Sequence, residues 1–221
     1  MAASISSDVK LLGFRASPFV NRAQFALNLK SVNYEFIVED TDNKSELLLK
    51  SNPVHKKVPV LIHGDKPVNE SLVIVQYIDE TWSDGPSILP ESPYDRAIAR
   101  FWAAYIDDKL FGSIMKWLTD AKDEESKAAV LEKFSESLGL LEEAFVKSSH
   151  GKGFFGGENP GYLDIALGCH LGWLKVVEMD AKVKLLDETK TPALAEWSHR
   201  IQSHEAVKGT LPEPDELLSA L

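Results

Sequence analysis

The segment that most constrains the fold runs from Lys57 to Ser71 and reads Lys-Val-Pro-Val-Leu-Ile-His-Gly-Asp-Lys-Pro-Val-Asn-Glu-Ser. A β-rich run from Val58 to Ile62 is followed by a His-Gly-Asp turn and by a second short strand from Lys66 to Val68. Pro59 has no backbone N–H, and a proline in such a run is tolerated only at a sheet edge or where the main chain turns outward. The segment therefore predicts a hairpin with free main chain at one end, and then a helix that starts at the Glu-Ser pair.

The residues before this hairpin predict a strand-helix-strand opening. Strands are expected at Val9 to Phe14 and at Tyr34 to Val38, with a helix between them that runs from Pro18 to about Lys30. An irregular or helical stretch follows from Asn43 to Lys50. The predicted order is β-α-β-α-β-β-α, in which the first crossover is parallel and right-handed and the hairpin adds an antiparallel edge.

After a linker, the chain shows only helical patterns. Ser, Gly and Pro are frequent from Trp82 to Pro93, which is typical of a connection. The expected helices run from Asp95 to about Asp120, Glu124 to Lys147, Tyr162 to Val177, and Pro192 to Ser203. We therefore predict an α+β domain over residues 1–82, a linker over 83–93, and an all-helical domain over 94–221.

Composition excludes several classes of function. The chain has 221 residues and a net charge of -10, which argues against a surface for nucleic acid or for anionic membranes, since such surfaces use clustered Lys and Arg. No segment approaches the about 20 apolar residues of a membrane helix, and the first residues lack the pattern of a signal peptide. Cys169 is the only cysteine and lies in an apolar helical run, so it is expected to be a buried small side chain. A reducing, cytoplasmic location is expected.

Two motifs of cofactor type are rejected. Gly151 to Gly156 matches a dinucleotide fingerprint as a string, but it follows a helical pattern and lies in the helical half of the chain. Cys169 and His170 are neighbours that point to different faces of a helix and cannot converge on one ion. Since the six histidines show no metal-site spacing, no metal is expected.

Several candidate site residues also have ordinary structural interpretations when each is taken alone. Ser17 before Pro18 is what a common helix start looks like, and the Glu-Ser pair at residue 70 could open a surface helix in the same way. Lys44 and Lys57 could be solvated surface lysines. Only the joint order of these residues favours a binding site.

Taken together, the motifs resemble the cytosolic glutathione transferases, and in particular the plant tau class. The segments that carry this resemblance occur in the same order over nearly the whole chain: Ser17-Pro18-Phe19, Asn52 to Leu61, Asn69-Glu70-Ser71, Phe154 to Gly157, and Gly161 to Ala166. The chain departs from the family at Gly161, where Ser or Thr is usual. This change removes one half of a capping box, although Asp164 can still cap the helix from position N3.

The resemblance implies a role in glutathione binding for five residues. Glu70 accepts from the γ-glutamyl ammonium, and Ser71 with the amides of its helix start receives the γ-glutamyl carboxylate, because helix starts favour anions. Lys44 and Lys57 meet the glycyl carboxylate. The backbone of Val58 pairs with the cysteinyl main chain, as a strand pairs at a sheet edge.

The resemblance also implies which residue activates the thiol. The thiolate is the reactive form, and a free thiol has a pKa of about 8.5. A hydroxyl at the first turn of a helix can stabilise the thiolate, and by resemblance Ser17 is that donor. The resemblance also implies that the peptide bond before Pro59 is cis. By resemblance, four residues are candidates for an apolar wall that receives the electrophile, although for any one of them core packing is the favoured interpretation: Phe14, Phe111, Met115 and Trp173.

The resemblance implies transfer of the glutathione thiolate to hydrophobic electrophiles, as in detoxification and plant stress responses. Peroxidase activity toward organic hydroperoxides is an additional activity of the family. A non-catalytic carrier of hydrophobic metabolites is an alternative. A thiol transferase or dehydroascorbate reductase is disfavoured, because the hydroxyl of Ser17 cannot form the mixed disulfide that such exchange requires. The resemblance implies a two-fold homodimer, with glutathione as co-substrate and no metal.

Overall fold

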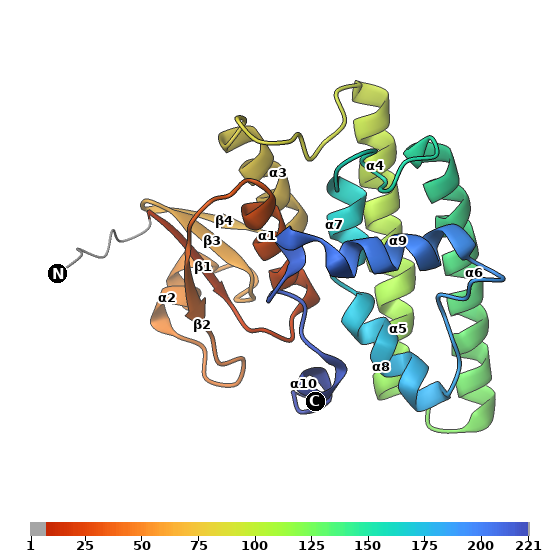
Figure 1. The fold of residues 1–221 in the computed structure, drawn as a ribbon. Helices are drawn as coiled ribbons and strands as arrows, with labels where there is room; N and C mark the ends of the chain where they lie inside the picture. The colour runs from red at the N-terminus through yellow and green to blue at the C-terminus, as the bar shows by residue number, and fades with distance from the viewer. Residues whose placement is uncertain (1–7, 221) are drawn as a thin grey trace. The chain divides into compact units, whose positions relative to one another are not determined.

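The computed structural model describes residues 8–220 and divides them into two compact units (Figure 1). The first unit extends to Ser87 and also includes Gly209–Leu211. The second unit contains Ile88–Lys208 and the residues from Pro212 onward. The division at Ser87 falls within the segment 83–93, whereas the return of Gly209–Leu211 to the first unit has no counterpart in the sequence pattern.

The first unit contains one four-stranded sheet and three helices, in the predicted order β-α-β-α-β-β-α. Its elements are β1 (Val9–Gly13), α1 (Pro18–Leu29), β2 (Glu35–Val38), α2 (Glu46–Ser51), β3 (Val60–His63), β4 (Lys66–Asn69) and α3 (Ser71–Thr81). The strand order is β2-β1-β3-β4, with β1 parallel to β2 and antiparallel to β3, and with β3 antiparallel to β4. The β-α-β-α-β-β-α order predicted from the sequence is confirmed.

Alternation along the two central strands supplies both faces of this sheet with apolar side chains. Leu12, Val60 and Ile62 form one buried cluster with Leu48 of α2. The neighbouring strand residues Leu11 and Leu61 are also fully buried and point to the opposite face. Helices α1 and α3 pack against each other, and Figure 1 shows them across the sheet from α2. The sheet is therefore covered on both sides.

The second unit is helical. It contains α4 (Pro93–Tyr105), a π-helical turn η1 (Ile106–Phe111), α5 (Gly112–Thr119), α6 (Glu124–Ser149), α7 (Tyr162–Gly168), α8 (Leu171–Ala181), α9 (Pro192–Ser203), a 3-10 turn η2 (Glu205–Val207) and α10 (Pro214–Leu218). The prediction of an all-helical second half is confirmed.

Two of the predicted helices differ in detail from the observed ones. The helix expected from Asp95 to about Asp120 begins at Pro93 and contains the π-helical turn before α5. The helix expected from Tyr162 to Val177 is two helices, because the chain turns at Cys169 and His170. Both of these residues keep negative φ angles and both are buried, so the apolar pattern continues through the break and does not reveal it.

A buried carboxylate organises the start of α7, as expected for a cap from position N3. Asp164 accepts hydrogen bonds from the backbone N–H groups of Gly161 (2.7 Å), Gly156 (2.9 Å) and Phe155 (3.0 Å), and from the indole of Trp197 (2.7 Å). Complete burial raises the pKa of Asp164 to about 6. The carboxylate thus fastens a loop and α9 to the start of α7.

Close packing explains the glycine at position 161. A Cβ there would lie 2.9 Å from the Cα of Gly156 and 3.1 Å from the carbonyl oxygen of Ile88. A serine would supply the missing half of the capping box, but only after these backbones had moved apart. In this chain, the close approach of Gly161 to the backbones of Gly156 and Ile88 occupies the space that a capping side chain would need.

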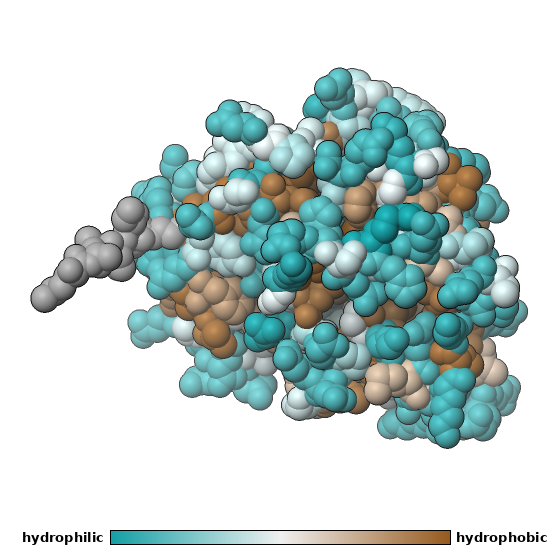
Figure 2. All heavy atoms as spheres, in the orientation of Figure 1, coloured by the Kyte–Doolittle hydropathy of each residue, from teal (hydrophilic) through white to brown (hydrophobic). Residues whose placement is uncertain are grey.

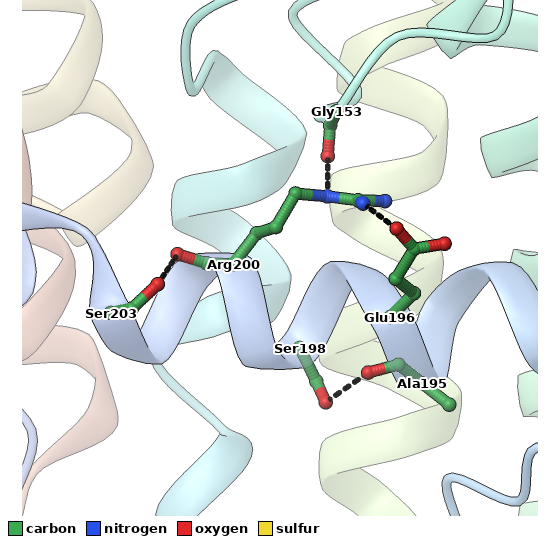
Figure 3. A network of polar contacts seen from close by, with 6 residues as sticks. All are labelled: Gly153, Ala195, Glu196, Ser198, Arg200 and Ser203. Atoms are coloured by element: carbon green, nitrogen blue, oxygen red, sulfur yellow. Dashed lines mark hydrogen bonds and ion pairs between the residues drawn. The ribbon is translucent and has the colours of Figure 1, made fainter.

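The loop before α7 is also held from α9 (Figure 3). The Nε of Arg200 donates to the carbonyl oxygen of Gly153 at 3.0 Å, and its guanidinium forms an ion pair with Glu196. Figure 3 also shows Ser198 and Ser203 bonded to carbonyl oxygens of their own helix. The glycine-rich string in this loop therefore belongs to a clamped connection between α6 and α7.

The surface is mixed in character. On the face drawn in Figure 2, hydrophilic side chains are interspersed with small apolar areas. Among residues 8–220, no helix is both long enough and apolar enough to cross a membrane.

Candidate functional site

The sheet register brings four chain segments to one end of the sheet. Leu12 of β1 pairs with Val60 at the start of β3, and Val60 in turn pairs with Asn69 at the end of β4. The end of β1, at Gly13, lies beside the end of the parallel strand β2, at Val38. Four segments therefore leave the sheet at the same end: those that follow β1, β2 and β4, and the one that precedes β3. They carry all of the residues predicted to bind or activate glutathione: Ser17, Lys44, Lys57, Val58, Glu70 and Ser71.

Ser17 is the N-cap of α1. Its Oγ accepts from the backbone N–H of Val20 at 3.3 Å, its own N–H donates to the carbonyl of Phe14 at 3.2 Å, and the residue is 5% exposed. A hydroxyl that accepts in this way keeps its hydrogen for a second bond. Among the described residues, that hydrogen has no acceptor. The structural and the catalytic interpretations of Ser17 are therefore compatible, since capping fixes the oxygen and leaves the donor available.

The segment before β3 contains a cis peptide bond between Val58 and Pro59, as the resemblance implies. The strand predicted from Val58 begins at Val60, which is the first residue paired with β1 and with β4. The side chain of Asn52 donates to the carbonyl of Lys57 at 2.9 Å and so holds the approach to this turn. Val58 is half-buried and lies outside the strand ladder, two residues before the start of β3.

Glu70 joins β4 to α3 in an unusual backbone conformation. Its φ is 73°, in the left-handed region that residues other than glycine rarely occupy. Its side chain is 64% exposed, and its Oε1 lies 3.8 Å from the Nε2 of His55. Such a conformation persists only where the surroundings impose it, and it is common at ligand sites. It presents the carboxylate to solvent immediately before the first turn of α3.

Ser71 is the first residue of α3 and is held by a residue that the sequence patterns did not indicate. The Nη1 of Arg22, in α1, donates to the Ser71 Oγ at 3.3 Å. Arg22 is fully buried, and its guanidinium lies 5.2 Å from the centre of the Phe19 ring, a cation–π contact. In the sequence an arginine on a helix is usually a surface residue. Only the packing of α1 on α3 shows that Arg22 is buried and contacts Ser71.

The two lysines lie on the exposed side of the same sheet end. Lys44 belongs to the loop between β2 and α2, and Lys57 to the segment before β3. The loop that carries Lys44 is anchored by buried Glu39, which accepts from the Ser45 hydroxyl at 2.7 Å and from the Ser45 N–H at 3.3 Å. Both lysines are exposed, so their ammonium groups are accessible to an anionic ligand.

The predicted electrophile wall draws on both units. Phe14 is half-buried in the loop before Ser17, in the first unit. Phe111 and Met115 come from the π-helical turn and from α5, and Trp173 from α8, all in the second unit. Met115 is exposed, whereas Trp173 is buried. The wall remains a prediction.

Other titratable groups show ordinary structural contacts. The thiol of Cys169 is buried and donates to the carbonyl of Ala166 at 3.3 Å. Within residues 8–220, no three side chains of His, Cys, Asp or Glu form a group that could hold a metal ion.

A thioredoxin-like unit with this site, followed by a helical unit, defines the architecture expected of a glutathione transferase. The glutathione S-transferase N-terminal domain matches residues 7–80, and the C-terminal domain of the same family matches residues 124–200. The chain is 59% identical over 213 residues to glutathione S-transferase U17 of Arabidopsis thaliana, covering 96% of this chain and 93% of that protein. It is 61% identical over 209 residues to U18 of the same plant, covering 94% and 92%.

Solved structures agree. The tau class glutathione S-transferase of mango, Mangifera indica, has a TM-score of 0.93 and 59% identity, over 97% of each chain. A rice glutathione S-transferase in complex with glutathione has a TM-score of 0.87 and 36% identity, over 97% of this chain and 96% of that one. The chain belongs to the glutathione S-transferase family, in its tau class.

Proposed function

We propose that this protein conjugates glutathione to hydrophobic electrophiles, with Ser17 as the catalytic residue. The observation that carries the proposal is the N-cap geometry of Ser17, whose oxygen is fixed by the Val20 N–H while its hydrogen is left for a ligand. A thiol placed there loses its proton to solvent, and the thiolate accepts the serine O–H at the positive end of α1. Lowering a thiol pKa by one unit requires about 1.4 kcal/mol, which one charge-assisted hydrogen bond can supply.

The remainder of glutathione is matched group by group. The exposed carboxylate of Glu70 takes the ammonium, and the hydroxyl of Ser71, oriented by Arg22, takes the γ-glutamyl carboxylate with the first amides of α3. Lys44 and Lys57 neutralise the glycyl carboxylate. Because each charge of the ligand has an opposite partner at one end of the sheet, binding fixes where the sulfur lies.

The bond-forming step needs only the thiolate and the electrophile. The sulfur lone pair attacks an electrophilic carbon, a C–S bond forms, and the leaving group departs with its bonding electrons. In conjugate addition there is no leaving group, and the carbanion takes a proton from water. In this proposal residues 94–221 supply an apolar surface for the electrophile, with Phe111, Met115 and Trp173 contributing from that unit and Phe14 from the first.

Replacing Ser17 in two ways tests the proposal. Ser17→Ala should lower kcat/KM with 1-chloro-2,4-dinitrobenzene about 100-fold, while the dissociation constant of glutathione changes less than about threefold. Ser17→Asp keeps an N-cap acceptor but has no hydroxyl donor, so it should be as inactive as the alanine variant while retaining stability. Ser17→Thr, which retains the hydroxyl, should stay within about tenfold of the unaltered protein. Normal turnover by Ser17→Ala would refute the assignment.

The same measurements separate two further activities. A carrier of hydrophobic metabolites would bind apolar ligands with negligible turnover across a varied panel of electrophiles. A peroxidase would consume glutathione when given an organic hydroperoxide, and that activity should fall with Ser17→Ala in parallel with conjugation.

We also propose that the protein is a cytoplasmic homodimer, on the basis of the family to which it belongs. Sedimentation at micromolar concentration should give a mass about twice that of one chain. A monomer at that concentration would refute this part of the proposal while leaving the catalytic part intact.

A further inference from the structure

The side chain of Asn21 holds two backbone carbonyls that are far apart in the sequence. It lies in α1, one turn after Ser17, and is 1% exposed. Its Nδ2 lies 2.8 Å from the carbonyl oxygen of Thr210 and 3.2 Å from that of Arg15. A primary amide has two N–H hydrogens, one for each carbonyl. The Oε1 of Gln24 lies farther away, at 3.4 Å.

These contacts surround the proposed catalytic residue. The backbone N–H of Asn21 donates to the carbonyl of Ser17 at 3.1 Å. Its side chain donates to the backbone carbonyl of Arg15, two residues before Ser17. The short loop between β1 and α1 is thus fixed from both sides by one residue. Ser17 lies at the end of this loop, as the N-cap of α1.

The second carbonyl belongs to a segment that returns from elsewhere in the chain. Gly209–Leu211 is part of the first unit, although the residues on either side of it in the sequence are part of the second. Thr210 lies between η2 and α10 in the sequence, and its carbonyl contacts α1 through Asn21. Thr210 is itself buried, and buried carbonyls require donors. The carboxamide of Asn21 therefore fastens this returning segment to the helix that Ser17 caps.

We infer that Asn21 is a positioning residue for thiol activation, and that through it the conformation of residues 209–211 controls the orientation of Ser17. The inference rests on the proposed role of Ser17. Replacement of Asn21 by an apolar side chain of similar size would remove this donor from both carbonyls. The bond to Thr210 is buried and the bond to Arg15 is partly buried, so the loss favours a shift of the loop. Since thiol activation depends on the placement of one hydroxyl, a small shift has a large effect on rate.

The first test is Asn21→Leu. With 1-chloro-2,4-dinitrobenzene, kcat should fall about tenfold, and the pH profile of kcat/KM should move to higher pH by about half a unit or more, because the thiolate is less well stabilised. The KM for glutathione should stay within about twofold, since the residues proposed to recognise glutathione are unchanged. A defect that is merely structural would lower the amount of active protein without moving the pH profile.

The second test perturbs the other end of the contact, with a matched control. Gly209 has a φ of 73°, and a Cβ added there meets no atom within 4 Å, so Gly209→Val strains the backbone without a clash at Cβ. Gly151 has a φ of 77° and equally open space, but it lies in the second unit, before α7. Gly209→Val should shift the pH profile in the same direction as Asn21→Leu, whereas Gly151→Val should leave it unchanged.

The double variant decides whether the two effects share one route. If Asn21 transmits the effect, Gly209→Val should add less than about twofold to the loss already caused by Asn21→Leu. Additive effects would overturn the inference, as would an unchanged pH profile in folded Asn21→Leu, or equal profiles for Gly209→Val and Gly151→Val. If Asn21→Leu does not fold, the comparison of the two glycine variants decides alone. If Ser17→Ala leaves the pH profile unchanged, the proposed function fails instead.

Discussion

Two helix starts in this molecule, those of α1 and α7, are organised around one polar side chain each, and they differ in what remains to be bonded. Asp164 at the start of α7 is fully buried and accepts four hydrogen bonds. Ser17 at the start of α1 accepts one, and its own hydrogen, which we propose is donated to glutathione, has no acceptor among the described residues. The difference separates a structural polar centre, in which every bond is made within the protein, from a site, in which one bond is reserved.

Replacing Asp164, whose hydrogen bonds are all made within the protein, should have the largest effect on stability. Asp164→Ala leaves four donors without their acceptor in a buried place, so the free energy of unfolding should fall by about 4 kcal/mol. Denaturation by urea measures the loss. Asp123, which caps α6 on the surface by accepting from Ser126 at 2.7 Å, is the control, and Asp123→Ala should cost much less. Equal losses would show that burial and bond number do not distinguish the two caps.

The pH dependence of stability should report the same carboxylate. Because burial raises the pKa of Asp164 to about 6, the folded state holds a proton that the unfolded state has already released between about pH 4 and pH 6. The contribution of this group is therefore greatest at low pH and is lost as the pH rises through about 6. Relative to Asp164→Asn, which does not titrate, the unaltered protein should lose up to about 3 kcal/mol over that interval. A constant difference between the two proteins would contradict the assignment.

Disturbing the open site should affect binding more than stability. Arg22→Lys keeps the charge but loses the rigid fork that reaches Ser71, so the KM for glutathione should rise about fivefold to tenfold while kcat changes less. Ser71→Ala should give a similar rise. If Arg22 acts through Ser71, the double variant should be no worse than either single one, and steady-state kinetics over a range of glutathione concentrations decides the point.

The sequence was sufficient for the parts of the fold that depend on local patterns. Strand alternation, the proline at the start of α1 and the turn after β3 are local signals, and they predicted the element order and the segments that carry Lys57 and Glu70. The bounds of the elements differ from the prediction: β3 begins at Val60 and not at Val58, which β-propensity alone does not reveal.

What the sequence could not predict depends on contacts between distant residues. From the sequence alone, Arg22 is expected to be a surface cation, but the packing of α1 on α3 buries it against Ser71. Asn21 is expected to be only a weak helix former, but its side chain donates to the carbonyl of Thr210, 189 positions away. The break between α7 and α8 is hidden because both sides of it are equally apolar. In each case the deciding term is tertiary burial, which a local pattern does not contain.

The return of residues 209–211 to the first unit has a consequence for anyone who would recombine this enzyme with its relatives. A chimera that exchanges only the residues up to Ser87 would separate α1 from the three-residue segment whose carbonyl it holds. The natural unit of exchange is discontinuous, so a graft of the glutathione-binding half should carry Gly209–Leu211 with it, even though the helices on either side come from the host.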